Sequence, residues 1–101
     1  MDRELVGRFD QEMEAIYYRA RDAVGYRATR FLQMVRRRGG LDAAHRLLSS
    51  STTSPGFRTL VHGGRKDLTV EALVLRSEFS DLFSQRELAT ARNRLDHPEE
   101  V

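Results

Sequence analysis

Residues 68–75 read Leu68-Thr69-Val70-Glu71-Ala72-Leu73-Val74-Leu75, a run that is apolar on nearly all sides. Periodicity alone does not separate a buried helix from a buried strand over so short a stretch. We expect a helix, because the flanking segments have helical patterns and a single strand would have no partner. Thr69 would cap the start of this helix and Glu71 would lie near its positive end. The helix is predicted to lie near the centre of the fold.

The segments before this run also predict helices. Apolar residues recur at spacings of three and four from Leu5 to Val24, which places them on one stripe of a long helix. Gly25 suits a left-handed cap at the end of that helix. A second helix is expected over Thr29–Arg38, capped by its first residue and ended by Gly39-Gly40, and a third near Leu41–Ser50.

Start signals mark the remaining helices. Ser54-Pro55 follows a polar segment over residues 49–54 and opens a helix that stops at Gly63-Gly64. Residues 78–83 suggest a short helical turn. Ser84-Gln85-Arg86-Glu87 then matches a capping box, in which Ser and Glu each satisfy the other's free backbone N–H. A last helix follows this box.

These patterns predict one all-α domain over residues 1–101, a compact bundle of five to seven short helices. Its parts are a long N-terminal helix over 1–24, a helical core over 25–97 and a frayed acidic tail over 98–101. A length of 101 residues suits a single domain. No stretch approaches the ~20 apolar residues of a membrane span, and the charged N-terminus leads into no secretory signal. We therefore expect a cytoplasmic protein with no membrane association.

Motifs for catalysis or cofactor binding are missing from the sequence. The chain has no cysteine, which excludes thiol nucleophiles, disulfides and sulfur-ligated zinc. The segment from Gly63 to Asp67 lacks the spacing of a phosphate-binding loop. Asp42 and His45 lie one helical turn apart and could ligate a metal or share a proton, but two ligands do not make a site, and Asp42 also complements a helix dipole. We expect no enzyme, no cofactor and no metal, with a metal-dependent enzyme using Asp42 and His45 as the least favoured alternative.

Arginine dominates the positive charge. The net charge is only +2, and every cation except Lys66 is an arginine. The run Arg36-Arg37-Arg38 is explained by the dipole of the helix that it ends, or by a phosphate-binding patch. Helical geometry places several polar residues on or beside one outward stripe. The candidate nucleic-acid contacts are Arg27, Arg30, Gln33, Arg36 and Arg37.

Tyrosines cluster around the end of the first helix. Tyr17 borders the apolar stripe and is expected in the core, whereas Tyr18 lies outside it. Tyr18 and Tyr26 are therefore candidate anchors for a protein partner, although tyrosine also serves at core edges.

About three quarters of the chain carries a recognisable pattern. Its residues are Gly25-Tyr26, Thr29-Arg30-Phe31-Leu32, Met34-Val35, Gly39-Gly40, Leu47-Leu48, Gly56-Phe57, Gly64-Arg65, Asp67-Leu68-Thr69-Val70-Glu71-Ala72-Leu73-Val74, Leu82-Phe83, Ala91 and Leu95. With this pattern the chain resembles a small, uncharacterised bacterial family of all-helical proteins, which occur alone or as terminal modules of larger chains. The resemblance implies a helical accessory or interaction module and assigns no active site.

Two functions are consistent with these observations. The first is a non-catalytic protein-interaction or accessory module of a bacterial cytoplasmic system, which binds a protein partner or a second copy of itself. The second is a small nucleic-acid-binding protein that contacts phosphates through the arginine-rich helix face.

Overall fold

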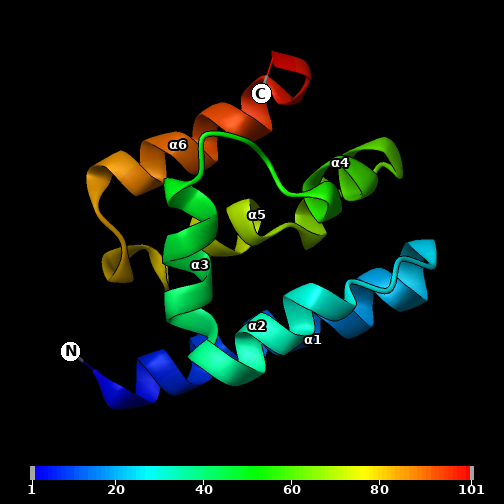
Figure 1. Cartoon of the computed structure of the whole chain (residues 1–101). Coiled ribbons are helices and arrows are strands. Elements are labelled where there is room, and N and C mark those ends of the chain that lie inside the picture. The colour runs from blue at the N-terminus through cyan, green and yellow to red at the C-terminus, as the bar shows by residue number, and fades with distance from the viewer. Residues whose placement is uncertain (1, 101) are drawn as a thin grey trace.

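The protein is all-helical (Figure 1). The computed structural model describes residues 2–100, which form six α-helices and three short 3-10 turns and contain no strand. The helices are α1 (Arg3–Val24), α2 (Thr29–Arg38), α3 (Gly40–Ser49), α4 (Pro55–His62), α5 (Val70–Val74) and α6 (Gln85–Asp96). The turns are η1 (Lys66–Leu68), η2 (Ser80–Leu82) and η3 (Pro98–Glu100). The predicted fold class is confirmed.

The apolar run forms a helix, as predicted. The Thr69 hydroxyl accepts a hydrogen bond of 3.1 Å from the backbone N–H of Ala72 and so caps α5. The helix is shorter than the run, because Leu68 belongs to η1 and Leu75 follows the last helical turn. α5 lies in the middle of the molecule, with the other helices arranged around it (Figure 1).

α1 and α2 run back along each other and form a helical hairpin (Figure 1). Gly25 ends α1 with a φ of 71°, the left-handed conformation expected at this position. The prediction that Thr29 caps α2 is wrong, since Thr29 is already the first helical residue. The preceding residue, Ala28, has no side-chain acceptor, and the Thr29 hydroxyl donates instead to the carbonyl of Arg27.

α3 begins against the side of α1. Oδ1 of Asp10 accepts from the backbone N–H groups of Gly40, at 2.7 Å, and Leu41, at 3.2 Å. Asp10 thus supplies from another helix the cap that α3 lacks locally. A Cβ on Gly40 would lie 2.9 Å from the Asp10 Cα, so this close approach of the two helices requires glycine.

The C-terminal part agrees with the local signals in the sequence. Both hydrogen bonds of the capping box formed by Ser84 and Glu87 are present at the start of α6. In the predicted acidic tail, residues 98–100 form η3, and Val101 lies outside the described residues.

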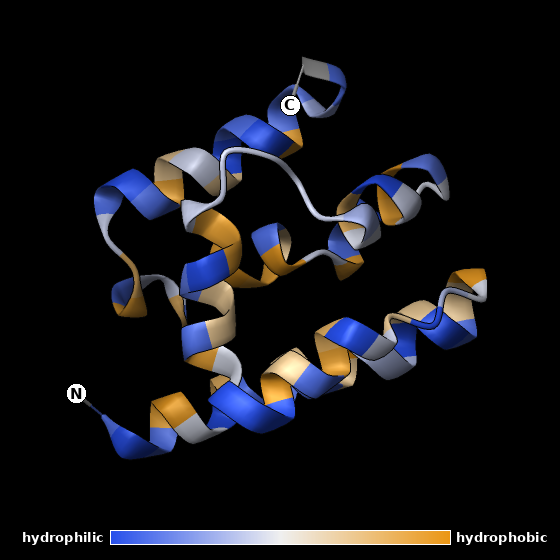
Figure 2. Ribbon diagram, viewed as in Figure 1, coloured by the Kyte–Doolittle hydropathy of each residue, from blue (hydrophilic) through white to orange (hydrophobic). Residues whose placement is uncertain are grey.

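The buried apolar side chains form two clusters. The larger one joins α1, α2, α3, α5 and α6 and includes Phe9, whose ring packs edge-on against Phe79 at 5.2 Å. The smaller one consists of Ala20, Leu60 and Leu68, with Val24 and Tyr26 packed against it. Figure 2 shows apolar residues along α5 and on α3, where these helices lie inside the fold.

Candidate binding pocket

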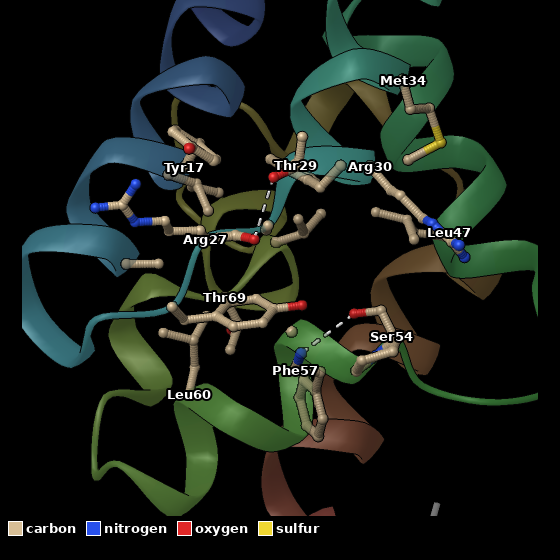
Figure 3. A pocket seen from close by; sticks show the side chains of 18 of the residues that line it. Tyr17, Arg27, Thr29, Arg30, Met34, Leu47, Ser54, Phe57, Leu60 and Thr69 are labelled. Carbon is tan, nitrogen blue, oxygen red and sulfur yellow. Dashed lines mark hydrogen bonds between the residues drawn. The ribbon is translucent and has the colours of Figure 1, made fainter.

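A pocket of about 480 Å³ opens between α1, α2, α3, α4 and the start of α5 (Figure 3). It lies between the two apolar clusters, and residues of both form its walls. Most of the lining side chains are apolar or aromatic. They include Ile16, Tyr17, Ala20, Tyr26, Phe31, Met34, Leu47, Phe57, Leu60 and Val70.

One buried carboxylate also lines the pocket. Glu71 of α5 accepts a hydrogen bond of 3.1 Å from Arg94 of α6, and each side chain exposes only 5% of its surface. Arg94 also donates to the carbonyls of Leu47, at 3.0 Å, and Ser50, at 2.7 Å. The Glu71 carboxylate is therefore neutralised by a cation and joins α5 to α6 and to the end of α3. Sequence reasoning assigned Glu71 only to the helix dipole, although a charge within an apolar run signals a buried partner.

Two arginines lie at the mouth of the pocket. Arg27 and Arg30 belong to its lining and are both exposed. Within the part of the chain that the structure describes, neither guanidinium has an ion pair. α2 starts between these two residues without a side-chain cap, which adds a partial positive charge at the same place.

The predicted nucleic-acid contacts divide into two groups. Arg30, Gln33 and Arg37 are exposed, as the helical geometry predicts, and Arg27, which precedes α2, is exposed as well. Arg36 is instead held against α1, where it pairs with Glu14 at 2.8 Å and donates to the hydroxyl of Tyr18. The hydrogen bond to Glu14 raises the pKa of Arg36 above its ordinary value.

The two candidate tyrosines have different surroundings. Tyr18 exposes 38% of its surface, and its ring packs edge-on against Tyr17 and beneath the guanidinium of Arg21. Tyr26 is half-buried, lines the pocket and packs against the smaller apolar cluster. Tyr18 is thus a surface side chain, whereas Tyr26 belongs to the pocket wall.

Asp42 and His45 bond to different partners. Asp42 pairs with Arg46 at 3.0 Å, and Nδ1 of His45 donates to Glu87 of α6 at 2.5 Å. Burial alone would raise the pKa of Glu87, but hydrogen bonds from the Ser84 backbone and from His45 outweigh burial and lower it. Among residues 2–100, no group of three or more His, Asp or Glu side chains is placed to hold a metal ion.

In comparisons with known proteins, no protein family, curated protein or solved structure matches the chain. None of the helices in the described range has the length and hydropathy needed to cross a membrane.

Proposed function

We propose that the chain is a non-catalytic helical accessory module that acts by binding, and that the pocket is its binding site. The observation that supports this is the hollow of about 480 Å³ on which five helices converge. The hollow is partly open to solvent, and most of the side chains that line it are apolar. The volume falls within the ~300–1,000 Å³ of ligand pockets. An apolar occupant would give the lining side chains the contacts that an unfilled hollow denies them.

Occupation of the pocket would also stabilise the fold. A ligand that binds only the folded state adds about 2.7 kcal/mol when its concentration is 100 times its Kd. A domain of this length buries a modest share of its surface, so such a gain is a large fraction of its total stability. The module would therefore be more stable to unfolding when it is loaded than when it is empty.

The proposal includes the setting that the resemblance implies. The module would work in a bacterial cytoplasm and associate with a protein partner or with a second copy of itself. Tyr18 would be a contact in such a complex, because it is a large side chain exposed outside the pocket. Light scattering over a concentration series tests self-association, which a monomer at every concentration would contradict.

The pocket is tested with the neutral dye N-phenylnaphthylamine, whose emission rises in apolar surroundings. We expect one dye molecule to bind per chain and Met34→Trp to weaken binding by at least about tenfold, because the larger side chain fills the pocket. Leu32→Trp is the matched control, since Leu32 is also half-buried on α2 but does not line the pocket. Circular dichroism checks that both variants are folded. Unchanged dye binding by a folded Met34→Trp variant would refute the assignment.

Nucleic-acid binding is the second candidate function. It is favoured by Arg27, Arg30 and Arg37, which are exposed beside Gln33 and have no ion pair within residues 2–100. If these residues contact phosphates, Arg37→Gln weakens binding to every sequence about equally and reduces the salt slope by about one. Titration of a DNA duplex at several salt concentrations measures this slope. Binding that does not depend on salt, or no binding at low salt, would exclude the second candidate.

A further inference from the structure

We propose that the occupant of the pocket is a small amphipathic carboxylate with a straight alkyl chain. The alkyl chain fills the apolar interior, and the carboxylate lies at the mouth beside Arg30. This inference rests on the proposed function and names the class of ligand. It differs from the nucleic-acid candidate, which shares Arg27 and Arg30 but adds Arg37 outside the pocket and leaves the apolar interior empty.

The interior selects an apolar body. Ile16, Phe31, Leu47 and Leu60 contribute side chains from four different helices, so an occupant is surrounded by hydrocarbon on several sides. Each methylene group that leaves water for such surroundings adds favourable transfer free energy. Met34, a flexible and polarisable side chain on the wall, adapts to the shape of a chain that bends.

The unpaired charge at the pocket is positive. The charged side chains in the lining are Arg27, Arg30 and Glu71. Glu71 is already neutralised by Arg94, whereas the two arginines at the mouth have no ion pair among the described residues. A cationic occupant would meet two like charges, and a neutral one would leave both arginines without a partner. Charge complementarity therefore favours an anion whose charge stays at the mouth.

Arg30 is the principal contact for the carboxylate. In Figure 3 its side chain runs from α2 towards Leu47 of α3, while Arg27 extends to the opposite side of the view. Both side chains are exposed, and a guanidinium holds a carboxylate through two parallel hydrogen bonds. One arginine is enough to hold the ligand, and the other adds to the local positive potential.

Three probes with the same alkyl chain and different head groups test this inference on the full chain. Decanoate, decanol and decyltrimethylammonium are titrated below their micelle concentrations, and chemical shifts of the backbone amides report the site. We expect decanoate to bind with one molecule per chain and about tenfold more tightly than decanol, because of its charge-assisted hydrogen bonds. The cation should bind more weakly than decanol. The shifts should be largest at Ile16, Phe31, Leu47 and Leu60.

Substitutions of arginine separate the charge from the apolar contact. Arg30→Gln should remove most of the preference for decanoate over decanol and leave the affinity for decanol unchanged. Arg37→Gln is the matched control, since Arg37 is exposed on the same helix and does not line the pocket. Equal affinity for the three probes, with shifts at the pocket, would refute the carboxylate and leave the pocket as a binding site. Shifts elsewhere, or none, would refute the binding site as well.

Discussion

Among single residues, Arg94 makes the most consequential contacts. It neutralises the buried Glu71 and also satisfies the carbonyls of Leu47 and Ser50, which the end of α3 leaves without helical partners. A buried carboxylate without its cation is strongly unfavourable. Arg94 therefore connects α6 to Glu71, which lines the pocket, and to the end of α3.

Replacement of Arg94 should be severely destabilising. We expect Arg94→Met to lower the free energy of unfolding by about 3–5 kcal/mol, because it leaves the Glu71 carboxylate buried without a cation. Arg92→Met, at an exposed position on the same helix, should change it by less than about 0.5 kcal/mol. Urea denaturation measures both values.

The double variant Glu71→Met/Arg94→Met distinguishes charge from packing. It should be more stable than Arg94→Met alone, because no buried charge remains. A double variant that is as unstable as the single one would show that the carbonyl contacts of Arg94, and not its ion pair, dominate.

The sequence did not reveal this pair for a physical reason. Glu71 and Arg94 are 23 positions apart and belong to different helices. The helical period of α6 predicts which residues share a face, but it does not give the rotation of α6 against α5. The position of Glu71 within an apolar run was therefore enough to predict a buried charge. The identity of its partner, Arg94, could only be read from the packed structure.

At the scale of helices, two glycines with different surroundings should respond to substitution in opposite ways. Gly7→Ala should raise the free energy of unfolding by about 0.5–1 kcal/mol, because Gly7 is an exposed helical residue with open space around it. Gly40→Ala should lower it by about 1–3 kcal/mol, because the new methyl group meets the backbone of Asp10. Thermal denaturation of the two variants measures both signs. A Gly40→Ala variant as stable as the wild type would contradict the close approach.

The contact between α3 and α6 gives the fold a dependence on acid. The pKa of Glu87 lies below its ordinary value of 4.5 in the folded protein, so its stabilising effect is complete above that value and is lost as pH falls through the lower folded pKa. Glu87→Gln keeps an acceptor for Ser84 and removes the charge beside His45. We expect this variant to lose less stability between neutral pH and the acid range below about pH 4.5. Denaturation midpoints over a pH series measure this loss.

Other carboxylates also contribute to the acid response. Arg65 and Arg76 lower the pKa values of Asp67 and Glu78, so the response of Glu87→Gln should be reduced and not abolished. Glu99→Gln, at an exposed position in η3, is the control and should follow the wild type. If Glu87→Gln also follows the wild type, the contact with His45 does not set the acid response.

Helix limits were predictable where the signals are local. The bounds of α2 and the capping box of α6 match the sequence patterns, because both depend on residues within one or two turns. The cap of α3 was not predictable, since Asp10 lies 30 residues before Gly40. Local sequence signals therefore predicted the helices, whereas the contacts between helices could not be predicted without the tertiary structure.

At the scale of the whole molecule, the two apolar clusters differ in size. We expect the smaller cluster to open first, because fewer buried contacts hold it. In native-state hydrogen exchange, the amide of Leu60 in α4 should have a lower opening free energy than that of Ala91 in α6. Equal opening free energies at these two amides would indicate that the clusters unfold as one unit.

The pocket could not be predicted from the sequence. Residues such as Ile16 and Phe31 follow the same periodic patterns as fully packed core residues, so the sequence does not distinguish the two kinds. Whether a pocket remains depends on how five helices pack against one another, and this tertiary arrangement is not encoded in the pattern of any single helix. The positive charge at its mouth was partly predictable, because Arg30 was expected to face outwards.

The unbroken course of α1 has a consequence for changes in its length. Met13 packs in the larger cluster and Ala20 in the smaller one, so a single rigid rod fixes the angular phase between them. An insertion of one residue between these positions would turn one cluster by about 100° relative to the other. An insertion of seven residues, about two whole turns, would nearly restore the phase but would separate the clusters by about 10 Å. This stretch of the chain therefore tolerates exchange of side chains far better than gain or loss of residues.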